Sequence, residues 1–168
     1  TLAQYLKVLD SLDSNNFNKT LELLLKVSPN GIDTYILPIL QTWAAAGSNQ
    51  QTGGLQIIKD QAERGVLEPI YDYHSALINE FIGNSEAAKI NYSNIIKKSN
   101  NANAQVYLSA AEFFKRNNNQ ELLDKTIAKL ERLKPYSNEL FLLKNSNVFP
   151  SKKINNVKDG IAEIFLNS

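Results

Sequence analysis

One pattern of large, small and apolar residues recurs five times along the chain and constrains the fold more than any other feature. Each copy has a large residue, two spacers, a smaller residue, an apolar neighbour, two more spacers and usually another apolar residue. The copies are Tyr5-Val8-Leu9-Leu12, Ile36-Ile39-Leu40-Trp43, Tyr73-Ala76-Leu77 with Glu80 or Phe81, Tyr107-Ala110-Ala111-Phe114, and Val157-Gly160-Ile161-Ile164. On a helix of 3.6 residues per turn these positions share one face. The pattern therefore predicts five amphipathic helices.

A polar turn and a second apolar stripe follow each of the first four copies, which begin on average 34 residues apart. The turns read DSNN at 13–16, GSNQ at 47–50, GNSE at 83–86 and NNNQ at 117–120. Gly or Asn can end a helix in the left-handed conformation, and Asn or Ser can cap the helix that follows. The chain is therefore predicted to repeat a helix–turn–helix hairpin.

Small residues stand where two helices of one hairpin are expected to cross. Ala87 and Ala88 open a second helix, and the matching small positions on the first helices are Ala76, Ala110 and Gly160. Pro38 should delay or kink the first helix of the second unit, because proline lacks an N–H donor. Gly53 and Gly54 either delay the next helix or mark a tight crossing.

Units of this length, with an alanine opening the second helix, resemble the tetratricopeptide repeat (TPR) superfamily. The closest stretch is IGNSEAAKINYSNII, and YILPILQTWAAAG and KDGIAEIF are similar to divergent bacterial, mainly alphaproteobacterial, TPR proteins. The resemblance implies an all-α fold, a right-handed superhelix (α-solenoid) of antiparallel helix–turn–helix TPR-like repeats. It also implies protein–protein interaction as the function.

Four hairpins are expected in residues 1–135, at about 1–30, 31–67, 68–102 and 103–135. Residues 136–153 break the period and are expected to form an irregular helical insertion. Residues 154–168 are expected to form the first helix of a further, truncated repeat, as in a fragment of a longer chain. The apolar face of that helix would need cover from 136–149 or from a second copy of the chain, as a homodimer.

Composition argues against several classes of function. The net charge is +1, whereas a nucleic-acid binder usually carries a basic face. Cysteine is absent, and His74 is the only histidine, without the convergent ligands or nucleophile that a metal site or catalytic triad needs. No stretch approaches the roughly 18 apolar residues of a membrane span. We therefore expect a non-enzymatic protein without cofactor or metal and without a membrane segment. A cytoplasmic location is expected as well, although a chain without cysteine suits either redox environment and targeting signals could lie outside a fragment.

The surface most suited to binding is the concave groove that first helices of stacked repeats line. Positions just off each apolar stripe should point into it, and the predicted groove residues are Asp10, Asp13, Gln41, His74, Glu112 and Lys115. This mixed surface favours a peptide or protein segment as the ligand. The other interpretation of the groove is that another segment of the same protein fills it.

Two other functions remain open at this stage. The chain could be a scaffold or regulatory domain of a larger, enzymatic protein. It could also be an RNA-binding helical repeat, which reads one base per unit. The near-neutral charge and the uneven repeat spacing count against RNA.

Overall fold

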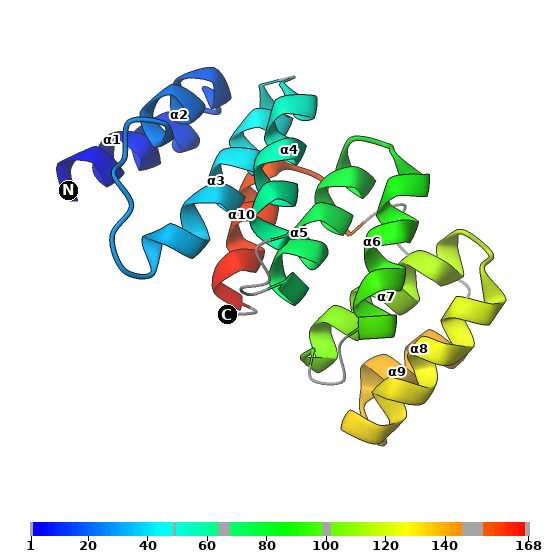
Figure 1. The fold of residues 1–168 in the computed structure, drawn as a ribbon. Helices are drawn as coiled ribbons and strands as arrows, with labels where there is room; N and C mark the ends of the chain where they lie inside the picture. Colours follow the sequence, from blue (N-terminus) through cyan, green and yellow to red (C-terminus); the bar gives the residue numbers. More distant parts are fainter. Residues whose placement is uncertain (1, 49, 64–67, 99–101, 146–152, 167–168) are drawn as a thin grey trace.

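The computed structural model of the chain describes residues 2–48, 50–63, 68–98, 102–145 and 153–166. This part of the chain is all-α, with ten helices and no strand (Figure 1). The helices are α1 (Leu2–Asp13), α2 (Phe17–Leu24), α3 (Asp33–Gly47), α4 (Gln51–Ala62), α5 (Glu68–Phe81), α6 (Ser85–Lys98), α7 (Ala104–Arg116), α8 (Gln120–Leu133), α9 (Asn138–Asn145) and α10 (Val157–Leu166).

Successive helices pack in pairs, α1 with α2, α3 with α4, α5 with α6, and α7 with α8. Within three of these pairs, a left-handed residue turns the chain from the first helix to the second: Asn15 (φ 55°), Gly83 (φ 84°) and Asn118 (φ 53°). The side chain of Asn16 then accepts a hydrogen bond from the Lys19 amide and caps α2. The expected chemistry of these turns is confirmed.

The close contact between α3 and α4 depends on Gly54. A Cβ atom on Gly54 would lie 2.7 Å from the Cβ of Ala45, so this glycine marks a tight crossing. Thr42 Oγ1 lies within hydrogen-bonding distance, 3.0 Å, of the Gly54 carbonyl oxygen, which stabilises the contact. Pro38 lies inside α3, which begins at Asp33, so of the two effects expected of this proline, a late start or a kink, the late start is wrong. The proline removes one helical hydrogen bond without ending the helix.

Of the predicted small positions, Ala76, Ala88, Ala110 and Gly160 are buried, whereas Ala87 is only partly buried. Ala76, Ala88 and Ala110 are fully buried, and large side chains fill the space around them. Tyr92, for example, packs against Phe113 with 5.0 Å between ring centroids. The core therefore runs continuously from one helix pair to the next.

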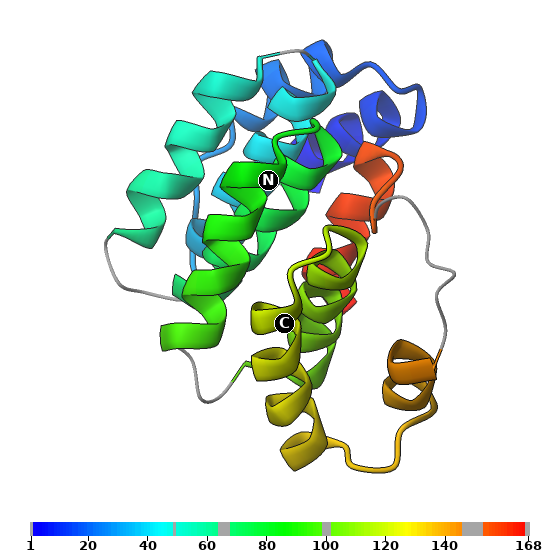
Figure 2. The same cartoon turned by 90° about the vertical axis from the view of Figure 1, so that its right-hand side faces the viewer.

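The last helix lies across the earlier pairs. α10 packs on α3 and α5, and Figure 2 shows it, in red, beside the first helices of the chain. The first helix of a further repeat, which the sequence predicted here, would instead stack after residues 136–153. The physical reason is the apolar face of α10, for which α3 and α5 provide a buried contact. Among the described residues, no helix has both the length and the apolar character that crossing a membrane requires.

Candidate functional site

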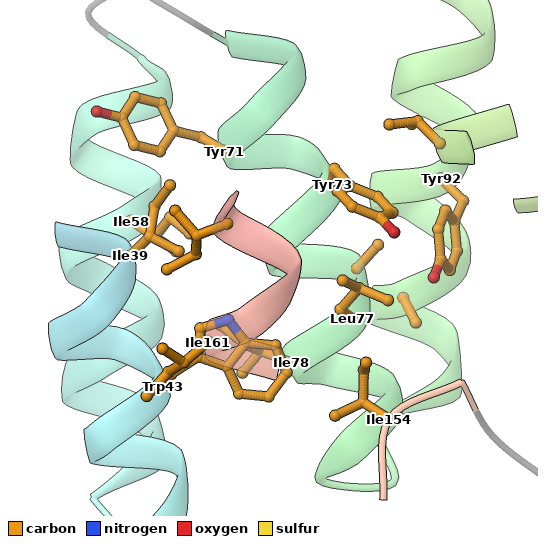
Figure 3. Packing of buried hydrophobic residues seen from close by; sticks show 14 of the residues in the cluster. Ile39, Trp43, Ile58, Tyr71, Tyr73, Leu77, Ile78, Tyr92, Ile154 and Ile161 are labelled. Atoms are coloured by element: carbon orange, nitrogen blue, oxygen red, sulfur yellow. The ribbon is translucent and has the colours of Figure 1, made fainter. Parts of the chain in front are cut away.

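The candidate site is the face of α3 and α5 against which α10 packs, which we call the inner face. Four α10 positions at helical spacing of three and four are buried there, Val157, Gly160, Ile161 and Ile164. Ile154, just before the helix, is buried as well. Figure 3 shows α10 passing between α3 and α5 among their buried side chains. The apolar stripe that defined α10 in the sequence is therefore the surface it buries.

Gly160 allows α10 to approach α3 closely. A Cβ atom on Gly160 would lie 2.4 Å from Cη2 and Cζ2 of Trp43, well inside van der Waals contact. At the other end of the contact, a Cβ atom on Gly47 of α3 would lie 2.8 Å from Cγ2 of Val157. One glycine on each helix therefore makes room for a large side chain of the other.

Trp43 also links α3 to α5 through a hydrogen bond. Its Nε1–H donates to Nδ1 of His74 over 3.2 Å, and both side chains are buried. Because the indole N–H can only donate, Nδ1 must accept, so neutral His74 carries its proton on Nε2. Burial lowers the pKa of His74 to about 3. The imidazole is therefore neutral at physiological pH.

A buried hydroxyl connects α5, α7 and α10. Tyr73 donates a hydrogen bond to Glu163 Oε2 over 2.9 Å, and its oxygen lies 3.1 Å from Oγ of Ser109. Glu163 also lies 3.8 Å from Nζ of Lys153, in the segment that precedes α10. Burial and the nearby Glu163 carboxylate raise the pKa of Tyr73, so the hydroxyl stays protonated. A buried carboxylate of α10 is thus satisfied by side chains on both sides.

A second charged pair lies beside this hydroxyl, between α5 and α7. Arg116 and Glu80 form a largely buried salt bridge of 2.5 Å, and Glu80 Oε1 also accepts the Lys153 backbone N–H over 3.1 Å. Glu112 of α7 is partly buried near this group. Desolvation raises its pKa, while Lys153 and Arg116 lower it less. Three carboxylates and two cations therefore gather where the last segment meets α5 and α7.

Three of the predicted groove residues lie at or near residues 153–166, which comprise α10 and the residues just before it. Asp13 accepts a hydrogen bond from Nζ of Lys158 at its backbone oxygen, over 2.9 Å. His74 is buried against Trp43, directly behind the Gly160 contact. Glu112 interacts electrostatically with Lys153 and Glu163.

The other three predicted groove residues have different surroundings. Asp10 is exposed on α1. Gln41 donates to the carbonyl oxygen of Leu24 over 3.2 Å, and Lys115 donates to that of Leu143. Gln41 and Lys115 therefore hold neighbouring segments together. The six predicted residues do not form one continuous surface.

Sequence reasoning missed Tyr73, Glu80 and Glu163 as polar contacts of the inner face. Tyr73 and Glu80 were assigned to an apolar stripe, and no sequence signal links Tyr73 to a residue 90 positions away. The amphipathic pattern of α10 was visible, but it could not identify the helices that cover it. The described residues contain no group of three or more His, Asp or Glu side chains that could hold a metal ion.

Comparison of the chain with protein-family models, with curated proteins and with solved structures gives no match. The functional interpretation therefore rests on the geometry of the inner face.

Proposed function

We propose that this chain is a non-catalytic protein–protein interaction module, a TPR-like α-solenoid whose inner face binds an amphipathic helix of a partner protein. The partner helix would take the position that α10 occupies. The observation that carries the proposal is α10 itself, an amphipathic helix seated on the inner face through anchors at Val157, Gly160, Ile161 and Ile164. Spacing of this kind characterises helix-in-groove recognition.

The contacts of α10 define the ligand that the inner face would select. Its residues run apolar-x-x-Gly-apolar-x-Glu-apolar from Val157 to Ile164. The glycine is required opposite Trp43, because a side chain there would collide with the indole. The glutamate is favoured by the Tyr73 hydroxyl, which donates to Glu163 Oε2. A partner helix should therefore carry these two residues three positions apart, between apolar anchors.

α10 would compete with such a partner. It is covalently joined to the other helices, and a short tether gives a local concentration on the order of millimolar. A partner helix must therefore bind the inner face more strongly than α10 does at this local concentration, or bind when α10 has been released. In this proposal α10 regulates the inner face.

A second candidate function is that of a scaffold domain in which α10 is a permanent part of the core. The observation that favours it is the burial of Glu163, whose carboxylate accepts from Tyr73 and lies near Lys153. Withdrawing one member of a buried, paired charge cluster is costly, because the groups left behind stay buried without their partner. On this view the chain presents other surfaces to a larger assembly.

Amide hydrogen exchange separates the two functions. The interaction module requires α10 to open by itself, so amides of 157–166 should exchange through a local opening while α3 and α5 stay protected. Exchange of α10 only at the rate of global unfolding would contradict the proposal and support the permanent scaffold.

A further inference from the structure

An apolar cavity of about 290 Å³ lies between the N-terminal parts of α3, α5 and α7. Its walls are mainly aliphatic and aromatic, including Ile39, Ile70 and Val106, and Ile164 of α10 closes one side. Exposed Ile32 is at its edge. The volume is at the lower end of the roughly 300–1,000 Å³ of ligand pockets, and holds about ten non-hydrogen atoms at ~30 Å³ each.

The described residues lining this cavity carry no charge, so a charged ligand would lose its hydration without an opposite charge to replace it. Most polar groups in the wall already have partners. Tyr71 donates to the carbonyl oxygen of Tyr35 over 3.1 Å, and Tyr73 is bonded to Glu163. Asn103 accepts the backbone N–H of Val106. Because these polar groups are already hydrogen-bonded, the wall presents mainly apolar surface to a ligand.

His74 provides a further donor, at its second ring nitrogen. It lines the cavity, is 1% exposed, and uses Nδ1 to accept from Trp43, so its Nε2 carries a proton. No hydrogen bond joins Nε2 to the described part of the chain. Burial keeps the ring neutral by lowering its pKa to about 3. Because His74 lines the cavity, a ligand oxygen there would give Nε2–H an acceptor in place of water.

We infer that this cavity binds a small, uncharged apolar ligand with a single carbonyl-type oxygen, which accepts the hydrogen bond of His74 Nε2–H. The apolar body of the ligand packs against the walls from α3, α5 and α7. The ligand also contacts Ile164, so its binding favours docked α10. This inference does not depend on the proposed function, because the cavity is formed with α10 docked and requires no partner helix.

Three matched fluorinated probes test the site on the full chain by fluorine NMR. They are para-fluoroacetophenone, which has the acceptor, para-fluoroethylbenzene, which lacks it, and para-fluorobenzoate, which is charged. The ketone should bind saturably, and the ethyl compound about tenfold more weakly, as expected for one buried hydrogen bond. The benzoate should bind more weakly still. Equal binding of the ketone and the ethyl compound would overturn the inference, as would absence of saturable ketone binding.

A pair of alanine substitutions locates the binding. Ala102→Leu adds bulk to the cavity wall, whereas Ala104→Leu makes the same change two residues on, outside the cavity. Ala102→Leu should weaken ketone binding by at least about tenfold, and Ala104→Leu by less than about twofold. Equal affinities in the two variants would place the probe elsewhere and overturn the inference.

The histidine itself gives a readout that needs no substitution. His74 is the only histidine, so its ring nitrogens give one set of signals in a proton–nitrogen correlation spectrum. The ketone should shift the Nε2–H resonance, and the ethyl compound should shift it much less. An unmoved Nε2–H resonance at saturating ketone would contradict the hydrogen bond to His74.

Discussion

Gly160 and Trp43 fit together so closely that a Cβ atom on the glycine would lie 2.4 Å from the indole ring. Trp43 is fully buried and is held by its hydrogen bond to His74, so it cannot move aside without losing that bond. The position of α10 on the inner face therefore depends on the absence of one side chain. Because Trp43 is the only tryptophan, its fluorescence reports directly on this contact.

Replacing Gly160 with alanine should lower the free energy of unfolding by about 1–3 kcal/mol, because the methyl group overpacks the contact with Trp43. Tryptophan emission should shift to longer wavelength as α10 is displaced. The control is Gly53→Ala, another helical glycine, around which an added Cβ meets nothing within 4 Å. That change should stabilise the protein by about 0.5–1 kcal/mol. Urea unfolding measures both, and a stabilised Gly160→Ala would refute the close contact.

The Tyr73 hydroxyl should contribute measurably to the docking of α10. Tyr73→Phe removes a donor from Glu163 and a partner from Ser109, and should cost about 1–3 kcal/mol because buried polar atoms lose their bonds. Tyr136→Phe is the matched control, since Tyr136 is 98% exposed and its change should stay within about 0.5 kcal/mol. Chemical denaturation of the two variants compares them. Equal stability would show that the buried hydroxyl contributes nothing.

Breaking the buried salt bridge should be far more costly than breaking an exposed one. Arg116→Met leaves Glu80 buried without its cation, for an expected loss of about 3–5 kcal/mol. Lys125→Met breaks an exposed i,i+4 pair with Glu121 and should cost no more than about 0.5 kcal/mol. Thermal or urea unfolding gives both values. Similar losses in the two variants would mean that Glu80 is solvated in solution.

Stability should fall on acidification because of His74. Burial lowers its folded-state pKa to about 3, below the usual 6.5, so between these values the unfolded chain binds a proton that the folded chain does not. The contribution is present above about pH 6.5 and is lost as the pH falls towards 3. From pH 7 to 5 the loss should be about 2 kcal/mol.

His74→Gln is the control for this pH effect, since glutamine does not titrate and can still accept from Trp43. The raised pKa of Glu112 acts in the opposite direction, because it favours the folded state at low pH. The comparison of wild type with His74→Gln therefore isolates the histidine. If both proteins lose the same stability between pH 7 and 5, His74 is not buried and neutral as described.

Local structure followed from the sequence where the signals were local. Asn15, Gly83 and Asn118 take the left-handed turns that their residue types indicated, and Gly54 marks a tight crossing. Of the late start and the kink that Pro38 indicated for α3, the late start is wrong, because the helix tolerates Pro38 at the loss of a single hydrogen bond. Where a helix such as α3 begins depends on only a few residues around its first turn.

The inner face could be predicted only in part. The stripe from Val157 to Ile164 indicated that α10 needs a partner, and one interpretation of the groove was that the protein's own chain fills it. The stripe does not say which helices provide the cover, because many apolar faces would satisfy it. The pairing of Glu163 with Tyr73 depends on the position of α10 in space, and no local pattern encodes it.

The most direct test of the interaction proposal is whether the inner face binds a helix supplied in trans. A fluorescein-labelled peptide of residues 153–166 would be titrated by fluorescence anisotropy into the full chain carrying Gly160→Leu, whose own α10 cannot dock. Circular dichroism would first establish that the variant is folded, and the same peptide with Gly160→Leu would serve as control. We predict saturable binding of the native peptide to the variant, with weaker binding to wild type and none of the control peptide. A folded variant that ignores the native peptide, or that binds both peptides equally, would contradict the proposal that the inner face is a selective helix-binding site.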